Sequence, residues 1–226
     1  MHPSITMAKP LRPEPKYFLV DEVFEKGLDY YTKHWFGSVP DGIITGEKSA
    51  NYLESSVAAH RIKSQIPDIR LIFILRDPVN RAWSNYLWSK MNGLETMDFR
   101  EAILHESERE LILPPHLRYA RPFSYVSRGM YADFLSVYLE LFSNEKILCL
   151  FYEELRESPV MLLDQVHAFL GVELRGEDGS GLGVVNPATG NDDIIPEDCR
   201  ELLEARFLEP NQKLDAMLGR RNKAWS

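Results

Sequence analysis

Residues 71–86, LIFILRDPVNRAWSNY, carry the clearest fold signal of this sequence. It begins with consecutive apolar residues, a pattern typical of a strand that is buried on both faces of a parallel sheet. Arg76 and Asp77 follow directly, and then Pro78, a residue that favours the first turn of a helix. The stretch therefore predicts a strand over residues 70–75, a charged turn, and a helix over residues 80–91.

The end of such a strand is a common place for anion binding. Ligands bind at the carboxyl ends of parallel strands, and the N-terminus of the next helix favours negative charge. The guanidinium of Arg76 and the hydroxyl of Ser84, two helical turns along, together suit one phosphate group. A simpler interpretation is that Arg76 pairs locally with Asp77 and that Ser84 is a helix surface residue. The residues alone leave both interpretations open.

The rest of the chain alternates strands and helices. A second apolar run predicts a strand over residues 146–151, and apolar positions three and four residues apart predict helices over residues 131–142 and 159–170. This order predicts an α/β fold of three layers, with a mostly parallel central sheet, in a single domain over residues 1–226. Residues 93–128 suit either a substrate lid or a solvated helix with a connector, and residues 176–191 predict a long loop.

Composition excludes several classes of function. The net charge of −8 argues against a broad nucleic-acid surface. No run approaches the roughly 18 apolar residues of a membrane span, and the histidines show no paired metal-ligand spacing, so no metal is expected. Cys149 and Cys199 suit reduced thiols, which predicts a cytoplasmic protein. The sequence does not fix the oligomeric state.

Residues 71–86 resemble the 3′-phosphate-binding motif of the sulfotransferases that use 3′-phosphoadenosine-5′-phosphosulfate (PAPS). In that family a strand ends in Arg-Asp-Pro, and a serine lies eight residues after the arginine. PEPKYF (residues 13–18) and GEKSANYL (46–53) resemble segments of the heparan-sulfate-type members and their bacterial relatives. SRGMY (127–131) and EPNQKL (209–214) continue the family's order, so that the resemblance covers residues 2–225.

The resemblance implies a P-loop-NTPase-like sulfotransferase fold, with PAPS as co-substrate and no metal. It also implies an enzyme that moves a sulfuryl group to a hydroxyl or amine of a glycan or small-molecule acceptor. Arg76 and Ser84 would hold the 3′-phosphate of the nucleotide. Arg128 and Gly129 would contact the same side of the nucleotide, although Gly129 also suits a simple turn before a helix.

Two further residues are implied to act in catalysis. Glu14 matches the family's proposed general base, and Lys48 matches a lysine that lines the active site of the glycan-acting branch. Each has an alternative, because Glu14 could be a solvated acid between two prolines and Lys48 could pair with Glu47 on the surface. Tyr30, Tyr31 and Trp35 suit either an acceptor-stacking surface or the core.

The resemblance breaks at one point. The family opens with a strand and a Pro-Lys-x-Gly-Thr-Thr loop that cradles the 5′-phosphosulfate, and no Gly-Thr-Thr or Walker-like segment occurs in this sequence. We therefore expect the first strand and phosphate loop to be missing. The chain would be either a truncated enzyme or a degenerate module that binds nucleotide or a protein partner without turnover. The absence of such a loop also argues against a P-loop kinase, which would need a similar loop. Residues 186–191, at the place of a nucleotide-covering loop, carry no basic residue.

Overall fold

The structure is a computed structural model, and it describes residues 2–174, 194–220 and 225. The chain divides into two compact units, which are described separately below. Unit 1 comprises residues 2–71 and 134–147, and unit 2 comprises residues 72–133 and the described residues from 148 onward. The single domain expected over residues 1–226 stays a prediction.

Unit 1 contains a small parallel sheet and short helices. Strands β1 (Ile5–Met7) and β2 (Ile44–Gly46) pair in parallel, with Ile5 opposite Ile44 and Met7 opposite Gly46. The helical elements are α1 (Asp21–Phe24), α2 (Leu28–Trp35), the 3₁₀ turn η1 (Ala50–Tyr52), α3 (Ser56–Gln65) and the 3₁₀ turn η4 (Asn144–Lys146). Helix α7 (Tyr131–Leu141) begins in unit 2 and continues in unit 1.

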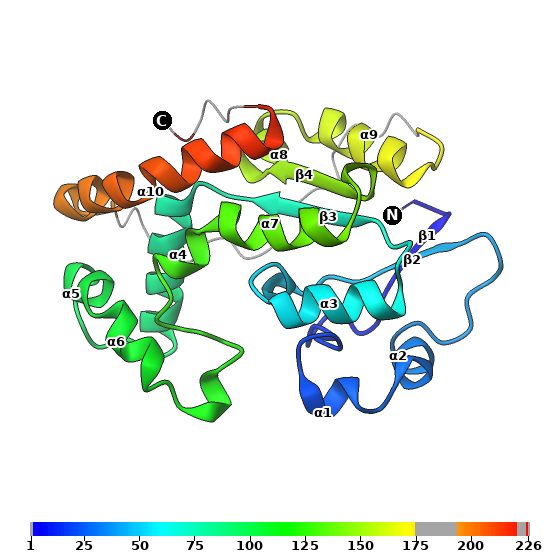
Figure 1. Cartoon of the computed structure of the whole chain (residues 1–226), viewed down its shortest axis with the longest axis horizontal. Coiled ribbons are helices and arrows are strands. Elements are labelled where there is room, and N and C mark those ends of the chain that lie inside the picture. Colours follow the sequence, from blue (N-terminus) through cyan, green and yellow to red (C-terminus); the bar gives the residue numbers. More distant parts are fainter. Residues whose placement is uncertain (1, 175–193, 221–224, 226) are drawn as a thin grey trace. The chain divides into compact units, whose positions relative to one another are not determined.

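Unit 2 is built around the decisive stretch. Strand β3 (Leu71–Leu75) pairs with β4 (Ile147–Phe151), and in Figure 1 the two arrows point in the same direction. Both strands were predicted from sequence and are confirmed. The remaining elements are α4 (Pro78–Met91), α5 (Phe99–Leu104), α6 (Glu106–Leu111), the 3₁₀ turns η2 (Pro115–Leu117) and η3 (Ser127–Gly129), α8 (Tyr152–Glu157), α9 (Pro159–Leu170) and α10 (Glu197–Leu218).

The chain passes from β3 into α4 through a capped turn. Asp77 is the N-cap residue of α4, and its side chain accepts a hydrogen bond from the backbone N–H of Asn80 at 2.6 Å. Pro78 occupies the first helical position, where its missing N–H costs nothing. The helix therefore begins two residues earlier than the start that we predicted at residue 80.

Each unit has its own apolar core. In unit 1, Leu135 and Tyr138 of α7 and Phe142, the residue after the helix ends, are buried at the three- and four-residue spacings that predicted this helix. In unit 2, α4, α5 and α10 share one cluster with the segment before η3. Its members include Ala82, Tyr86, Phe99, Ile103, Tyr125, Leu203 and Phe207. This cluster fixes α4, which carries Ser84, and η3, which carries Arg128 and Gly129.

Residues 93–128 contain the short helices α5 and α6, the 3₁₀ turn η2 and the start of η3, joined by connecting segments. This resembles the helix-and-connector alternative, except that α5 packs into the core instead of being solvated. Residues 176–191 and the predicted loop at 186–191 lie outside the described residues. Within the described residues, no helix is long and apolar enough to cross a membrane. The same residues contain no group of three or more His, Cys, Asp or Glu side chains that could hold a metal ion.

Candidate functional site

Arg76 directly follows the last residue of β3, and the N–H groups of its guanidinium are not used in hydrogen bonds to the described residues. The guanidinium carbon lies 5.4 Å from the centre of the Tyr152 ring, and the backbone carbonyl accepts a hydrogen bond from the Tyr131 hydroxyl at 3.0 Å. Among the described residues no side-chain hydrogen bond or ion pair involves the guanidinium. Its N–H groups can therefore serve a bound anion, while the ring helps to hold the side chain.

The Asp77 carboxylate caps a helix instead of pairing with Arg76. It accepts from Asn80, and the Asp77 backbone N–H donates to Glu153 Oε1 at 3.0 Å. The ion pairs of the described residues do not include Arg76 with Asp77. Burial raises the pKa of Asp77, while the Asn80 N–H and the charge of Arg76 act in the opposite direction. The simpler interpretation of a local ion pair thus receives no support from the side-chain geometry.

Arg128 contacts α4 at Asn85, the residue that follows Ser84 in the sequence. Its Nη1 donates to Asn85 Oδ1 at 3.4 Å. Ser84 is half-buried, and its hydroxyl makes no hydrogen bond within the described part of the chain. The structure thus brings Arg128 to the helix that carries Ser84.

Tyr131, three residues after Arg128, contacts the end of β3 through its hydroxyl. Burial raises the pKa of Tyr131 to about 12, and the positive charges of Arg81 and Arg128 oppose that rise. The same hydroxyl donates to the Arg76 carbonyl. Two arginine charges and the negative charge of Asp77 therefore act on one buried tyrosine, and its hydroxyl binds the backbone of Arg76.

Gly129 is a close-packing position in unit 2. A Cβ atom added there would lie 2.6 Å from Phe207 Cε1 and 3.1 Å from Pro78 Cβ. Its backbone N–H donates to the Val126 carbonyl at 2.8 Å within the 3₁₀ turn η3. The residue therefore lies in the turn that the sequence allowed for, and it also permits η3 to approach α10 and the start of α4. Its contact with nucleotide stays a prediction.

The two residues predicted for catalysis lie together in unit 1. Lys48 Nζ donates to Glu14 Oε1 at 2.6 Å, and Glu14 Oε2 accepts from the backbone N–H of Ala50 at 3.3 Å. The Lys48 side chain is 75% exposed and the Glu14 side chain 18% exposed. Glu14 is thus a partly covered carboxylate held by two donors, and the alternative of a freely solvated acid is wrong.

Glu47 does not pair with Lys48 on the surface, as one alternative had it. It accepts from the Ser49 hydroxyl at 3.0 Å, and Ser49 in turn accepts from the backbone N–H of Lys16 at 3.0 Å. Burial raises the pKa of Glu47, and hydrogen bonds from Tyr52, Ser49 and Tyr31 oppose the rise. Glu47 and Ser49, on either side of Lys48, are thus linked by hydrogen bonds to the backbone of Lys16, two residues after Glu14.

Of the three aromatic residues considered for acceptor stacking, two lie in the core, and Tyr30 is half-buried with its ring stacked on His34 at 5.0 Å between centroids. Tyr31 and Trp35 are buried, and Tyr31 stacks on Tyr17 with ring centroids 4.5 Å apart. Ser49, Asn85 and Tyr131 are the contacts that sequence reasoning missed. All three lie inside segments quoted above, SRGMY, LIFILRDPVNRAWSNY and GEKSANYL, but the sequence pattern does not show what their side chains contact.

Parallel strands, a capped helix after β3 and an arginine at the turn define an α/β protein in which the end of β3 suits an anion. Residues 48–182 match the sulfotransferase domain family. The match covers more than half of the chain, and the chain belongs to this family. The expected family is therefore confirmed.

Relatives with curated names include heparan sulfate enzymes. The chain is 32% identical over 182 residues to mouse bifunctional heparan sulfate N-deacetylase/N-sulfotransferase 4 (Mus musculus), covering 76% of this chain and 20% of that protein. It is 32% identical over 175 residues to human heparan sulfate glucosamine 3-O-sulfotransferase 6 (Homo sapiens), covering 76% of this chain and 46% of that protein. The chain thus spans less than half of the length of either relative.

A solved structure supports the fold over nearly the whole chain. The crystal structure of a sulfotransferase from Alicyclobacillus acidocaldarius has a TM-score of 0.80 at 28% sequence identity, and the match covers 99% of this chain and 89% of that one. The predicted α/β sulfotransferase fold is confirmed. In the part of the chain that the structure describes, the strands form two two-stranded sheets, which is less sheet than a single central layer would give.

Proposed function

We propose that this chain is a sulfotransferase that moves a sulfuryl group from PAPS to a hydroxyl or amine of an acceptor. A glycan is the favoured acceptor because the named relatives modify heparan sulfate, and a small molecule is the other class that we consider. The observation that carries the proposal is the Glu14–Lys48 pair. Two residues 34 positions apart meet at 2.6 Å, in a chain of the sulfotransferase family.

The pair suits proton removal from an acceptor. As the acceptor oxygen or nitrogen forms its bond to sulfur, its proton passes to the Glu14 carboxylate. The bond between sulfur and the 5′-phosphate oxygen breaks, and adenosine 3′,5′-bisphosphate leaves. Lys48 orients the carboxylate and supplies positive charge near the sulfonate, as cations do in phosphoryl transfer.

Residues of unit 2 suit the nucleotide's 3′-phosphate. Arg76 offers guanidinium N–H groups and Ser84 a hydroxyl, and both lack hydrogen-bond partners for these groups within the described residues. Arg128 adds a second guanidinium beside α4. Arginine is well suited to this task because its planar fork matches two phosphate oxygens. Gly129 keeps the chain that carries Arg128 close to α4.

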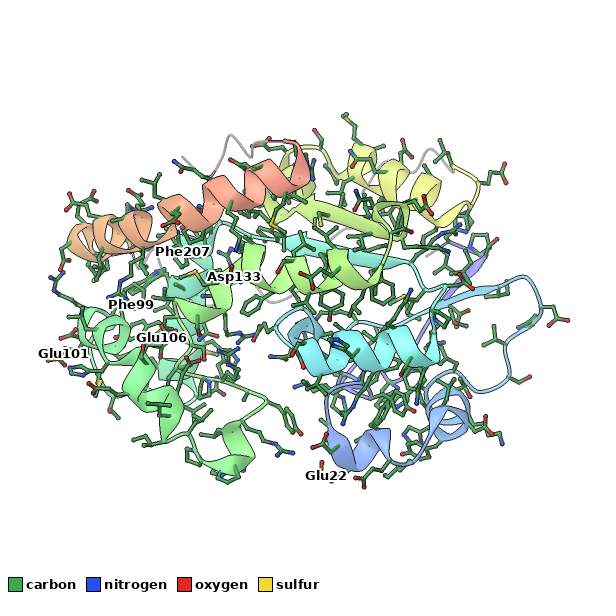
Figure 2. All side chains as sticks on the ribbon, in the orientation of Figure 1. Glu22, Phe99, Glu101, Glu106, Asp133 and Phe207 are labelled. Carbon is green, nitrogen blue, oxygen red and sulfur yellow. The ribbon has the colours of Figure 1, made fainter. Side chains whose placement is uncertain are left out.

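Transfer of labelled sulfuryl from PAPS to N-desulfated heparan sulfate tests the proposal. Changing Glu14→Gln keeps the side-chain shape and removes the base, so we expect kcat to fall about 10²- to 10³-fold with little change in KM for PAPS. Glu22→Gln is the matched control, because Glu22 is an exposed acid of the same unit on α1 (Figure 2), and we expect it to retain activity.

The same assay separates the enzyme from a module without turnover. A folded chain that binds adenosine 3′,5′-bisphosphate but transfers no sulfuryl group to any glycan or small-molecule acceptor would favour the degenerate module. Equal activity of the wild type and the Glu14→Gln variant would remove Glu14 from the mechanism.

A cytoplasmic location remains part of this proposal, supported by the free thiols of Cys149 and Cys199.

A further inference from the structure

A buried carboxylate on α6 binds the chain just before Arg128. Glu106 is 4% exposed, and it accepts hydrogen bonds from three consecutive backbone N–H groups. Its Oε2 accepts from Tyr125 at 2.9 Å and from Val126 at 2.6 Å, and its Oε1 accepts from Ser127 at 2.7 Å. A carboxylate is well suited to this position, since both oxygens accept and neither needs to donate.

A second carboxylate, one helical turn further along α6, holds the same segment through side chains. Glu110 Oε1 accepts from Arg121 Nη2 at 2.6 Å, from the Ser127 hydroxyl at 3.0 Å and from the Ser124 hydroxyl. Arg121 Nη2 also donates to the Ser127 hydroxyl at 3.0 Å. Glu106 and Glu110 therefore fix residues 124–127 from one helix.

The segment held in this way leads directly into the predicted nucleotide residues. Ser127 opens η3, Arg128 follows and donates to Asn85 of α4, and Gly129 packs against Phe207. Figure 2 labels Glu106 on α6 and Phe207 on α10, two of the elements that contact this segment. The backbone on either side of Arg128 is thus fixed by contacts that do not involve the Arg128 side chain.

We propose that Glu106 is a positioning residue for Arg128, with Glu110 in support, and that α6 thereby sets the affinity for the 3′-phosphate. This inference rests on the proposed function, because it takes Arg128 to be a phosphate ligand. The helices of residues 93–128 then act on the nucleotide side of the site, whereas the sequence suggested a substrate lid or a simple connector.

A double-mutant cycle with Arg128 tests this role by calorimetry on the full chain. Glu106→Gln leaves one acceptor oxygen and places an NH₂ group against backbone donors. We expect Glu106→Gln and Arg128→Ala each to weaken binding of adenosine 3′,5′-bisphosphate about 10-fold, and the double variant to bind no more weakly than Arg128→Ala. Affinity for adenosine 5′-monophosphate, which lacks the 3′-phosphate, should change less than 2-fold in Glu106→Gln.

Glu108→Gln is the matched control, because Glu108 lies on the same helix with its side chain 79% exposed and loses the same charge. We expect it to bind both nucleotides as the wild type does. If Glu106→Gln does not fold, as judged by circular dichroism, Glu110→Gln replaces it in the cycle. That change affects side-chain donors only, and we expect it to show the same dependence on Arg128 with a loss of about 3-fold.

The outcomes of this experiment distinguish an error in the proposed phosphate site from an error in the proposed role of Glu106. If the wild type binds no adenosine 3′,5′-bisphosphate, or if Arg128→Ala binds it normally, the proposed phosphate site is wrong and this inference falls with it. If Arg128→Ala loses affinity while the Glu106 or Glu110 variant binds normally, only the inference is overturned. Equal losses for both nucleotides, or losses that add in the double variant, would overturn it as well by showing a general structural role.

Discussion

Gly129 lies where η3, α10 and the start of α4 approach one another. The packing there leaves no room for a single additional carbon atom on this residue. The sequence placed Gly129 in a nucleotide-binding segment and allowed for a turn. It could not reveal the contact with Phe207, because that residue is 78 positions away and no local pattern links the two. For single residues, the sequence therefore predicted candidate site residues but not the side chains that they contact.

Gly129→Ala should destabilise unit 2. The added Cβ would meet Phe207 Cε1 at 2.6 Å, and Phe207 is a rigid ring that is 1% exposed. We expect a loss of about 1–3 kcal/mol in the free energy of unfolding, measured with urea.

Gly46→Ala serves as the comparison for Gly129→Ala. Its added Cβ would meet Met7 Sδ at 3.3 Å, the mobile end of a flexible side chain. We expect a smaller loss than for Gly129→Ala. Equal losses in the two variants would show that the Phe207 contact is not the cause.

At the scale of elements, strands β3 and β4 and helices α4, α7 and α9 were predictable because each has a long, clear pattern. The runs at residues 71–75 and 147–151 are continuously apolar, and a proline marks the start of α4 and of α9. Strands β1 and β2 have three residues each, too few to show a period. The role that we propose for Glu106 of α6 could not be predicted, since its partners are backbone N–H groups that any sequence supplies.

The start of α4 gives a prediction at this scale. Asp77→Ala removes the N-cap acceptor for Asn80, so we expect a loss of about 1 kcal/mol in the free energy of unfolding. Asp77→Asn keeps an acceptor of similar capping strength and should cost less. Urea unfolding of the three proteins at pH 7 measures both differences. An Asn variant as unstable as the Ala variant would contradict the capping role.

Asp77 also gives a pH dependence with a defined sign. Its folded-state pKa is raised, with burial as the largest cause, so the unfolded chain loses this proton first as the pH rises above roughly 4. Ionisation of Asp77 therefore costs stability with rising pH, and Asp77→Asn removes that cost. The stability of Asp77→Asn relative to the wild type should increase from pH 4 to pH 7 in the same urea experiment, and a decrease would contradict the raised pKa.

At the scale of the whole molecule, family membership is a stronger conclusion than any single site. The family match and the likeness to a solved sulfotransferase cover most of the chain, and the ordered segments from residue 13 to residue 214 made that family predictable. The acceptor was not predictable, because sugar recognition depends on side chains brought together by folding. The roles of Glu14 and Lys48 in unit 1 and of Arg76, Ser84 and Arg128 in unit 2 remain predictions that binding and transfer experiments decide.

Calorimetric titration of the chain with adenosine 3′,5′-bisphosphate tests whether it binds the nucleotide of PAPS through Arg76. We predict micromolar binding by the wild type and a loss of about 10- to 100-fold in Arg76→Ala, because the variant loses a charge-assisted hydrogen bond to phosphate. Arg156→Ala, which removes an exposed arginine of α8, should bind as the wild type does. A folded wild-type chain that does not bind this nucleotide, or an Arg76→Ala variant that binds it equally well, would contradict the account.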